Sequence, residues 1–352
     1  MSDEESGRGV ERLAQAAQQI ARAGAEAAIQ AVIQDLLSLV EDDDERPFGI
    51  LSQDPRHAGT PARRIDALAQ AAAKLGAEQK WIELQPSLED RVQHVAYVGE
   101  EAGNQTQMIL PRTLVIRFDP LDGTTNAVNI VNAFSSVATV DVVVDPKDRP
   151  RHLAGAIIGG EVDVSWSHWS RRSRQTSRYL RPLGQVFVRS IRTGTGWRRL
   201  DVAQDERDTA SVASVAASQK RFSAFAHFRE TAFARGGAVY HHAGNPLCSA
   251  LLLGHVGAFV ETQSVTLHDS VFLIPHWLLE GRIETIDLKP FDYLYEYECG
   301  ASNFDPGFKP IEPFIAFVGD INPFAENAEV SDIRDRSLRV APSRERVFRS
   351  DD

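Results

Sequence analysis

Cysteine is scarce in this chain of 352 residues, which contains only Cys248 and Cys299. Two cysteines without CxxC or Cys/His spacing exclude a disulfide scaffold and argue against a thiolate zinc site. They favour a reducing compartment. The first residues, Met-Ser-Asp-Glu-Glu-Ser, are acidic and lack the charge and apolar order of a secretory signal. We therefore expect a cytoplasmic protein.

Long apolar runs and an excess of positive charge are also missing. The longest apolar-leaning stretch, 247–260, has 14 residues and includes His255, whereas a membrane-spanning helix needs about 20. We expect no membrane span. The 49 Asp and Glu residues outnumber the 38 Lys and Arg residues, giving a formal net charge of -11. Because nucleic acids are bound through clustered basic side chains, we expect no nucleic-acid partner.

What the chain does have is an ordinary globular composition, with 43% hydrophobic and 25% charged residues. Apolar residues recur at steps of three and four over 10–40, which predicts an amphipathic helix. A second helix is predicted over 65–75, with Asp66 in its first turn and Gly76 as its stop. A third, small and apolar helix is expected over 248–257.

Short β-rich runs separated by turn residues follow the two helices, and they predict a sheet with helices on its faces. The runs are 113–118, 136–144, 154–164, 185–191 and 237–241. The segment 165–181 carries five arginines between Arg171 and Arg181. We interpret it as a solvated loop rather than a basic contact for an acidic ligand or partner. The highly charged segment 327–352 is predicted to be a partly disordered tail.

The most informative segment joins an apolar strand to an acidic turn, Arg117-Phe-Asp119-Pro-Leu121-Asp122-Gly123-Thr124-Thr-Asn126. Carboxylates at a strand end can hold hard divalent cations, and the N–H groups of a following helix start can hold a phosphate. Asp-Pro and Asp-Gly also occur in ordinary turns, so Asp-x-x-Asp alone does not decide between the two interpretations.

Two further acidic segments favour the metal interpretation. Gly99-Glu100-Glu101 places Glu100 19 residues before Asp119, and Leu267-His268-Asp269 follows the expected third helix. With these segments the chain resembles the inositol monophosphatase family, within the superfamily that includes fructose-1,6-bisphosphatase. The resemblance extends over about residues 10–318. It implies a layered α-β-α-β-α sandwich, with a metal-binding half at 1–160 and a sugar-facing half at 161–326.

The resemblance also implies a role for each candidate residue. Glu100, Asp119, Asp122, Asp269 and the carbonyl of Leu121 would hold two or three Mg²⁺ ions. Thr124 would hold the attacking water, helped by Glu100 and by Asp66, while Gly123 and Thr124 would bind the phosphate through backbone N–H groups. Asp122 would also contact the substrate, and Gly244 and Glu261 would lie on its sugar side. A homodimer is implied as well.

Two departures from the family pattern keep alternatives open. The segment 127–134 lacks the usual continuation after Asn126, which argues against assuming inositol specificity. The motifs do not separate inositol phosphate, fructose bisphosphate, histidinol phosphate and adenosine bisphosphate as substrates. His268 stands where the family has tryptophan, and it is expected to pack rather than to bind or carry a proton. The favoured function is a phosphomonoesterase acting on a small phosphorylated substrate. The alternative is a family member without turnover that binds such a ligand as a sensor or partner subunit.

Overall fold

The computed structural model describes residues 3–42, 50–53, 61–99, 109–124, 134–159, 162–169, 184–190, 196–200, 211–214, 226–241, 245–262, 265–266, 268–286, 289–301 and 310–317. The chain forms two compact units, Met1–Asp201 with Leu294–Lys309, and Val202–Tyr293 with Pro310–Asp352. The first unit continues beyond the division expected after residue 160, because the same sheet continues to Leu200. Among the described helices, none has the length and apolar character that a membrane span requires.

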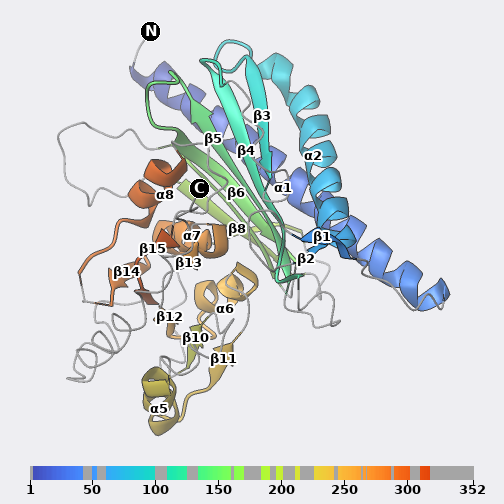
Figure 1. The fold of residues 1–352 in the computed structure, drawn as a ribbon. Coiled ribbons are helices and arrows are strands. Elements are labelled where there is room, and N and C mark those ends of the chain that lie inside the picture. Colours follow the sequence, from blue (N-terminus) through green and yellow to red (C-terminus); the bar gives the residue numbers. More distant parts are fainter. Residues whose placement is uncertain are drawn as a thin grey trace, which may run out of the picture. The chain divides into compact units, whose positions relative to one another are not determined.

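A seven-stranded sheet, in the order β3-β4-β5-β6-β7-β8-β9, forms the centre of the first unit (Figure 1). Only β3 and β4 pair in parallel; the later pairs are antiparallel. The strands are β3 (His94–Gly99), β4 (Thr113–Asp122), β5 (Ser135–Val143), β6 (Arg151–Ile158), β7 (Val162–His168), β8 (Gly184–Ser190) and β9 (Arg198–Leu200). A small hairpin of β1 (Ile50–Gln53) and β2 (Pro61–Arg63) stands apart from this sheet.

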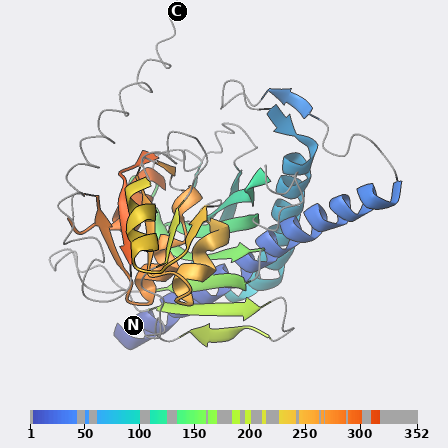
Figure 2. The ribbon, with the colours of Figure 1, turned by 90° about the horizontal axis from the view of Figure 1, so that it is seen from below.

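Two long helices, α1 (Asp3–Asp42) and α2 (Arg64–Leu84), pack together and cover one face of this sheet. In Figure 2, seen from below, α1 runs across the strands coloured from teal to yellow-green. The core beneath them joins apolar residues of both helices to alternate residues of the strands, such as Ala138 and Val140 of β5. This alternation is what a sheet with one face against helices requires.

The predicted end of the second helix at Gly76 is wrong, because α2 continues to Leu84. The glycine is inside the helix where the backbones of α1 and α2 approach closely. A Cβ atom at Gly76 would lie 2.6 Å from the carbonyl oxygen of Ala23 and 2.7 Å from Cβ of Ala27. Gly76 therefore serves helix packing rather than helix termination, which local sequence cannot distinguish.

The opposite face of the sheet carries a buried polar network. Asp141 of β5 accepts hydrogen bonds from Nε of Arg117 over 2.7 Å and from Nδ1 of His152 over 2.9 Å. Since an indole N–H can only donate, Trp166 Nε1 donates to Nε2 of His152 over 3.0 Å, and His152 is the neutral tautomer with its proton on Nδ1. The helix α8 (Tyr293–Ala301) contacts this face through Tyr297, whose hydroxyl is 2.7 Å from Thr139 Oγ1.

The second unit contains a five-stranded sheet in the order β11-β10-β12-β16-β14. Its strands are β10 (Val212–Ser214), β11 (Val239–His241), β12 (Ala258–Glu261), β14 (Arg282–Thr285) and β16 (Phe314–Phe317), and β13 (Val265–Thr266) pairs separately with β15 (Pro310–Ile311). Its helices are α5 (Ala226–Ala234), α6 (Cys248–Leu252) and α7 (Leu273–Leu278). The 3-10 turns among the described residues are η1 (Gln85–Ser87) in the first unit and η3 (Asn245–Leu247) and η4 (His268–Ser270) in the second.

Three other sequence predictions need correction. The single run 154–164 is two strands, because Gly159 with φ of 125° makes a turn in which its N–H donates to Asp163 Oδ1 over 2.9 Å. The expected helix 248–257 is only α6, which ends at Leu252. The expected loop 165–181 begins inside β7, where Trp166 is fully buried. The arginine-rich part 171–181 and the tail 327–352 lie outside the described residues.

Candidate active site

The acidic turn forms at the end of β4, where the strand leaves regular pairing. Asp119 pairs with Val137 and Asp122 with Ser135, so the register shifts between the two aspartates. Such a bulge re-aims side chains at a strand end. Gly123 follows with φ of 89°, a conformation that glycine adopts without strain. Asp119 and Asp122 are only 4% and 8% exposed.

The predicted helix-starting carboxylate meets this turn directly. Asp66 is in the first turn of α2 and is buried. The hydroxyl of Thr124 is 2.9 Å from Asp66 Oδ1 and 3.0 Å from the carbonyl oxygen of Leu121, and it can donate to either. The structure therefore brings Asp66, Leu121 and Thr124 together within the first unit.

Gln70 is a neighbouring polar residue that the sequence did not single out. It lies one helical turn after Asp66 on α2, and its Oε1 atom is buried without a hydrogen-bond partner among the described residues. A Cβ atom at Gly99, next to the predicted ligand Glu100, would lie 2.0 Å from that oxygen. A buried acceptor of this kind needs a donor or a cation. The four-residue spacing from Asp66 was its one sequence signal.

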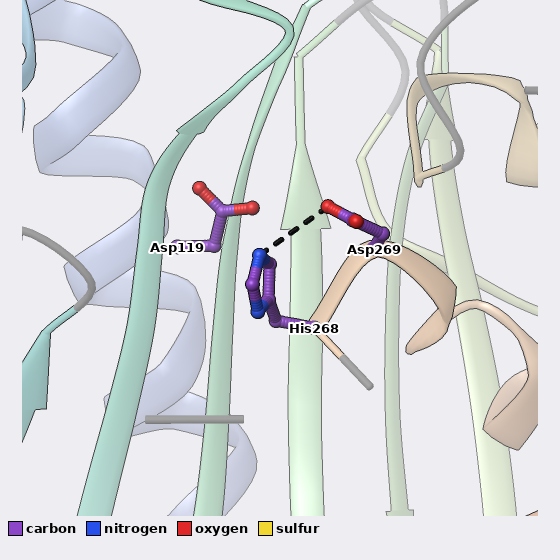
Figure 3. A group of neighbouring side chains, drawn as sticks. All are labelled: Asp119, His268 and Asp269. Atoms are coloured by element: carbon purple, nitrogen blue, oxygen red, sulfur yellow. Dashed lines mark ion pairs between the residues drawn. The ribbon is translucent and has the colours of Figure 1, made fainter. Parts of the chain in front are cut away.

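The second unit contributes a separate acidic group at η4. Thr266 Oγ1 donates to Asp269 Oδ2 over 2.5 Å, and His268 Nε2 lies 3.3 Å from Asp269 Oδ1. Figure 3 shows this ion pair. Both residues of the pair are partly exposed, and the contact makes His268 a neighbour of the predicted ligand rather than only a packing residue.

Buried polar contacts hold η4 in place. The side chain of Asn245, which is fully buried, donates from Nδ2 to the carbonyl oxygen of His268 over 2.7 Å and accepts from the N–H of Phe272 over 3.2 Å. Ser270 Oγ donates to the carbonyl oxygen of Thr266 over 2.9 Å. The backbone around Asp269 is thus fixed on both sides, and Asn245 is a second contributor that the sequence reasoning missed.

The remaining predicted residues divide into two groups. Glu261 ends β12 and is 1% exposed. Glu100 and Gly244 lie outside the described residues, as do residues 127–133 of the unusual segment 127–134. Within the described part of the chain, the predicted residues Asp66, Asp119, Leu121, Asp122, Gly123 and Thr124 belong to the first unit, whereas Asp269 and Glu261 belong to the second.

Comparison with solved structures finds inositol monophosphatases among the structures similar to this chain. A staphylococcal IMPase-II has a TM-score of 0.50 at 13% identity, over 95% of this chain and 98% of that chain. The inositol monophosphatase II of Staphylococcus aureus MSSA476 has a TM-score of 0.50 at 14% identity, over 94% and 97%. No protein-family model and no curated protein sequence matches the chain. The chain therefore has the α/β fold of the inositol monophosphatases, which confirms the expected fold class.

Proposed function

We propose that the chain is a Mg²⁺-dependent phosphomonoesterase that hydrolyses a small sugar, inositol or polyol phosphate. The observation that carries the proposal is the contact between Thr124 and Asp66 beside the buried aspartates of β4. A hydroxyl held by a carboxylate, next to a set of carboxylates, can orient a water molecule and keep a proton away from it. The fold shared with inositol monophosphatases supports the same reaction class.

The chemistry of the donor set fits magnesium. Asp119 and Asp122 offer hard oxygen atoms, which Mg²⁺ prefers, and two buried carboxylates so close in sequence are costly without a compensating cation. Asp119, His268 and Asp269 each offer an atom that could hold a metal ion. In this proposal Asp119, Asp122, Glu100, Asp269 and the Leu121 carbonyl hold two or three Mg²⁺ ions. Since the residues come from both units, their sharing of a cation is part of the proposal.

The residues of the chain then have separate roles in the proposed reaction. Bound magnesium would supply a water molecule of lowered pKa and charge compensation for the phosphoryl oxygens. Thr124 Oγ1 accepts a hydrogen bond from the attacking water, while its own proton is directed at Asp66. Backbone N–H groups of Gly123 and Thr124 bind the phosphate, as the amides of a tight turn can. Glu261 and Gly244 orient the sugar side of the substrate.

The test is inorganic phosphate release from a panel of sugar, inositol and nucleotide monophosphates, with and without Mg²⁺. Wild type is compared with Asp119→Asn, and we expect Mg²⁺-dependent release from wild type alone. If the protein binds substrate and Mg²⁺ but releases no phosphate, the proposed enzymatic activity is overturned in favour of a ligand-binding sensor or partner subunit. The matched control is Asp145→Asn, which changes an aspartate on an exposed turn. Arg117→Lys would not serve as a control, because it disturbs the buried network around Asp141.

A further inference from the structure

One side chain close to the acidic turn has a polar atom that the fold does not satisfy. Gln70 of α2 is partly exposed as a whole, but its Oε1 atom is buried and accepts no hydrogen bond from any described residue. Buried acceptors normally have a donor, and leaving one without a donor costs free energy. An acceptor kept at this cost beside a candidate site indicates that its donor arrives with a ligand.

The amide of Gln70 lies where β3 and β4 end. A Cβ atom at Gly99, the last residue of β3, would overlap both Oε1 and Nε2 of Gln70, so the amide lies directly over the backbone of this glycine. Gly99 is paired in register with Phe118, the residue before Asp119. Any larger residue at position 99 would displace the amide from the strand ends.

Asp66 and Gln70 are one helical turn apart, so they lie on the same face of α2. Asp66 is 2.9 Å from the hydroxyl of Thr124, at the far end of the acidic turn. This face of the helix therefore presents two oxygen acceptors to the ends of the strands. A bound Mg²⁺ ion retains several water molecules, and the protons of these water molecules need acceptors beyond the direct ligands of the ion.

We propose that Gln70 is a positioning residue of the Mg²⁺ site, whose Oε1 atom accepts a hydrogen bond from a water molecule that the ion retains. The inference rests on the proposed function. A neutral amide adds this acceptor without adding to the negative charge of Asp119 and Asp122, which is already costly when no cation compensates it. The terminal torsion of glutamine is broad, so the oxygen can turn toward the water molecule at little cost.

This role and a purely structural role predict different results for Gln70→Met. If Gln70 only helped α2 to pack, the substitution would leave Mg²⁺ binding unchanged. If Gln70 holds a water molecule of the ion, the substitution removes the unsatisfied oxygen, which stabilises the ion-free protein, and it weakens Mg²⁺ binding. Methionine is close to glutamine in shape and in helix propensity, so it changes little else.

The experiment measures the full chain with Mg²⁺ alone, without substrate. Isothermal titration calorimetry gives the Mg²⁺ affinity, and differential scanning calorimetry in EDTA gives the Tm of the ion-free protein. We expect Gln70→Met to bind Mg²⁺ about 10- to 100-fold more weakly than wild type, and to melt about 2–4 °C higher in EDTA. Gln70→Glu keeps an oxygen acceptor, so it binds Mg²⁺ at least as tightly as wild type, but its added negative charge lowers the Tm in EDTA.

Gln18→Met is the matched control, because it removes a glutamine whose amide has a partner. Gln18 of α1 is 5% exposed, and its Nε2 donates to Ser165 Oγ over 3.3 Å. This control melts lower than wild type in EDTA and binds Mg²⁺ like wild type.

Gly99→Ala reaches the same amide by a second route, because its Cβ displaces Gln70. We expect it to weaken Mg²⁺ binding in the wild-type background and to have little further effect in Gln70→Ala, where the space is free.

The Mg²⁺ affinity and the Tm in EDTA together decide the inference. A Gln70→Met protein that binds Mg²⁺ as tightly as wild type overturns it, and so does one whose weaker binding comes with a lower Tm in EDTA. A wild type that binds no Mg²⁺ overturns the metal site of the proposed function and this inference with it. If Gln70→Met binds Mg²⁺ weakly and wild type releases no phosphate, the inference stands and only the enzymatic activity fails.

Discussion

The hydroxyl of Thr124 and the carboxylate of Asp66 lie 2.9 Å apart, although 58 positions separate them in the sequence. The contact joins the first turn of α2 to the turn that ends β4. Only the packing of α2 on the sheet can hold the start of the helix and the end of the strand so that these two groups meet. The packing of α2 is therefore part of the chemistry that we propose.

Asp66→Asn tests that contact. An amide cannot hold a proton as a carboxylate does, so we expect kcat for phosphate release to fall by about 10²–10⁴ while KM changes little. Thr124→Val gives a loss of similar size, whereas Thr124→Ser keeps the hydroxyl and most of the activity. The measurement is steady-state phosphate release at saturating Mg²⁺. Full activity in Asp66→Asn would show that the carboxylate has no part in the reaction.

Asp119→Asn tests the buried carboxylates through stability. Asp119 and Asp122 are both buried, and their charges oppose folding when no cation compensates them. We expect the variant to melt a few degrees above wild type in EDTA, and to lose the rise in Tm that Mg²⁺ gives to wild type. Differential scanning calorimetry with and without Mg²⁺ measures both. A wild type whose Tm is the same in EDTA and in Mg²⁺ would contradict the metal site.

The sequence predicts the features whose causes are local. The strand predicted over 113–118, which runs into Asp119, and the helix that begins near Asp66 follow from the apolar period and from the residue types typical of helix starts and turns. Both elements are confirmed, as β4 and α2. Gly76 was misread because its cause is the approach of Ala23 and Ala27 on another helix. Such an approach leaves no mark in the neighbouring residues.

The buried network around Asp141 could not be predicted from the sequence either. Its histidine partner is 11 positions away, and Tyr297, which shares the same face, meets Thr139 across 158 positions. Each residue by itself is an ordinary strand or helix member. Polar groups inside a sheet face become a network only when the fold brings their partners together.

Gly76→Ala measures the helix contact. Alanine is favoured over glycine within a helix by about 1 kcal/mol, but its Cβ would meet the Ala23 carbonyl oxygen at 2.6 Å. We expect the clash to prevail and the free energy of unfolding to fall by about 1–3 kcal/mol. Gly196→Ala is the control, because a Cβ there meets nothing within 4 Å. Urea denaturation measures the free energy of unfolding of both variants. A Gly76→Ala protein more stable than wild type would contradict the close approach of α1 and α2 at this position.

We expect the substitution Asp141→Asn to change how the stability of the protein depends on pH in acid. Burial alone would raise the pKa of Asp141, but the hydrogen bond from His152 and the charge of Arg117 hold that pKa below its usual value. A lowered folded-state pKa contributes stability above the unfolded pKa of about 3.9, and that stability is lost as the pH falls through the folded value. The free energy of unfolding of the variant should therefore be about 3–5 kcal/mol lower than that of wild type at pH 7.

The same variant should show a shallower fall in stability below about pH 4, where wild type protonates Asp141. Urea denaturation between pH 3 and 7 gives both quantities. Asp145→Asn removes one exposed carboxylate outside the network and should follow the wild-type curve. Parallel pH curves for wild type and Asp141→Asn would show that Asp141 keeps its usual titration in the folded protein.

Thr266→Val tests whether Asp269 acts as a metal ligand. The Thr266 hydroxyl donates to Asp269 Oδ2 over 2.5 Å, so it fixes the direction in which the carboxylate presents its other oxygen. Valine has nearly the same shape but no donor, and loss of such a supporting contact usually costs 10- to 100-fold in metal affinity. We expect the half-saturating Mg²⁺ concentration for phosphate release to rise by about that factor, with kcat at saturating Mg²⁺ much less affected. Thr266→Ser keeps the donor and should titrate like wild type. If Thr266→Val also titrates like wild type, Asp269 is oriented by His268 or is no ligand, and His268→Phe then separates these two outcomes.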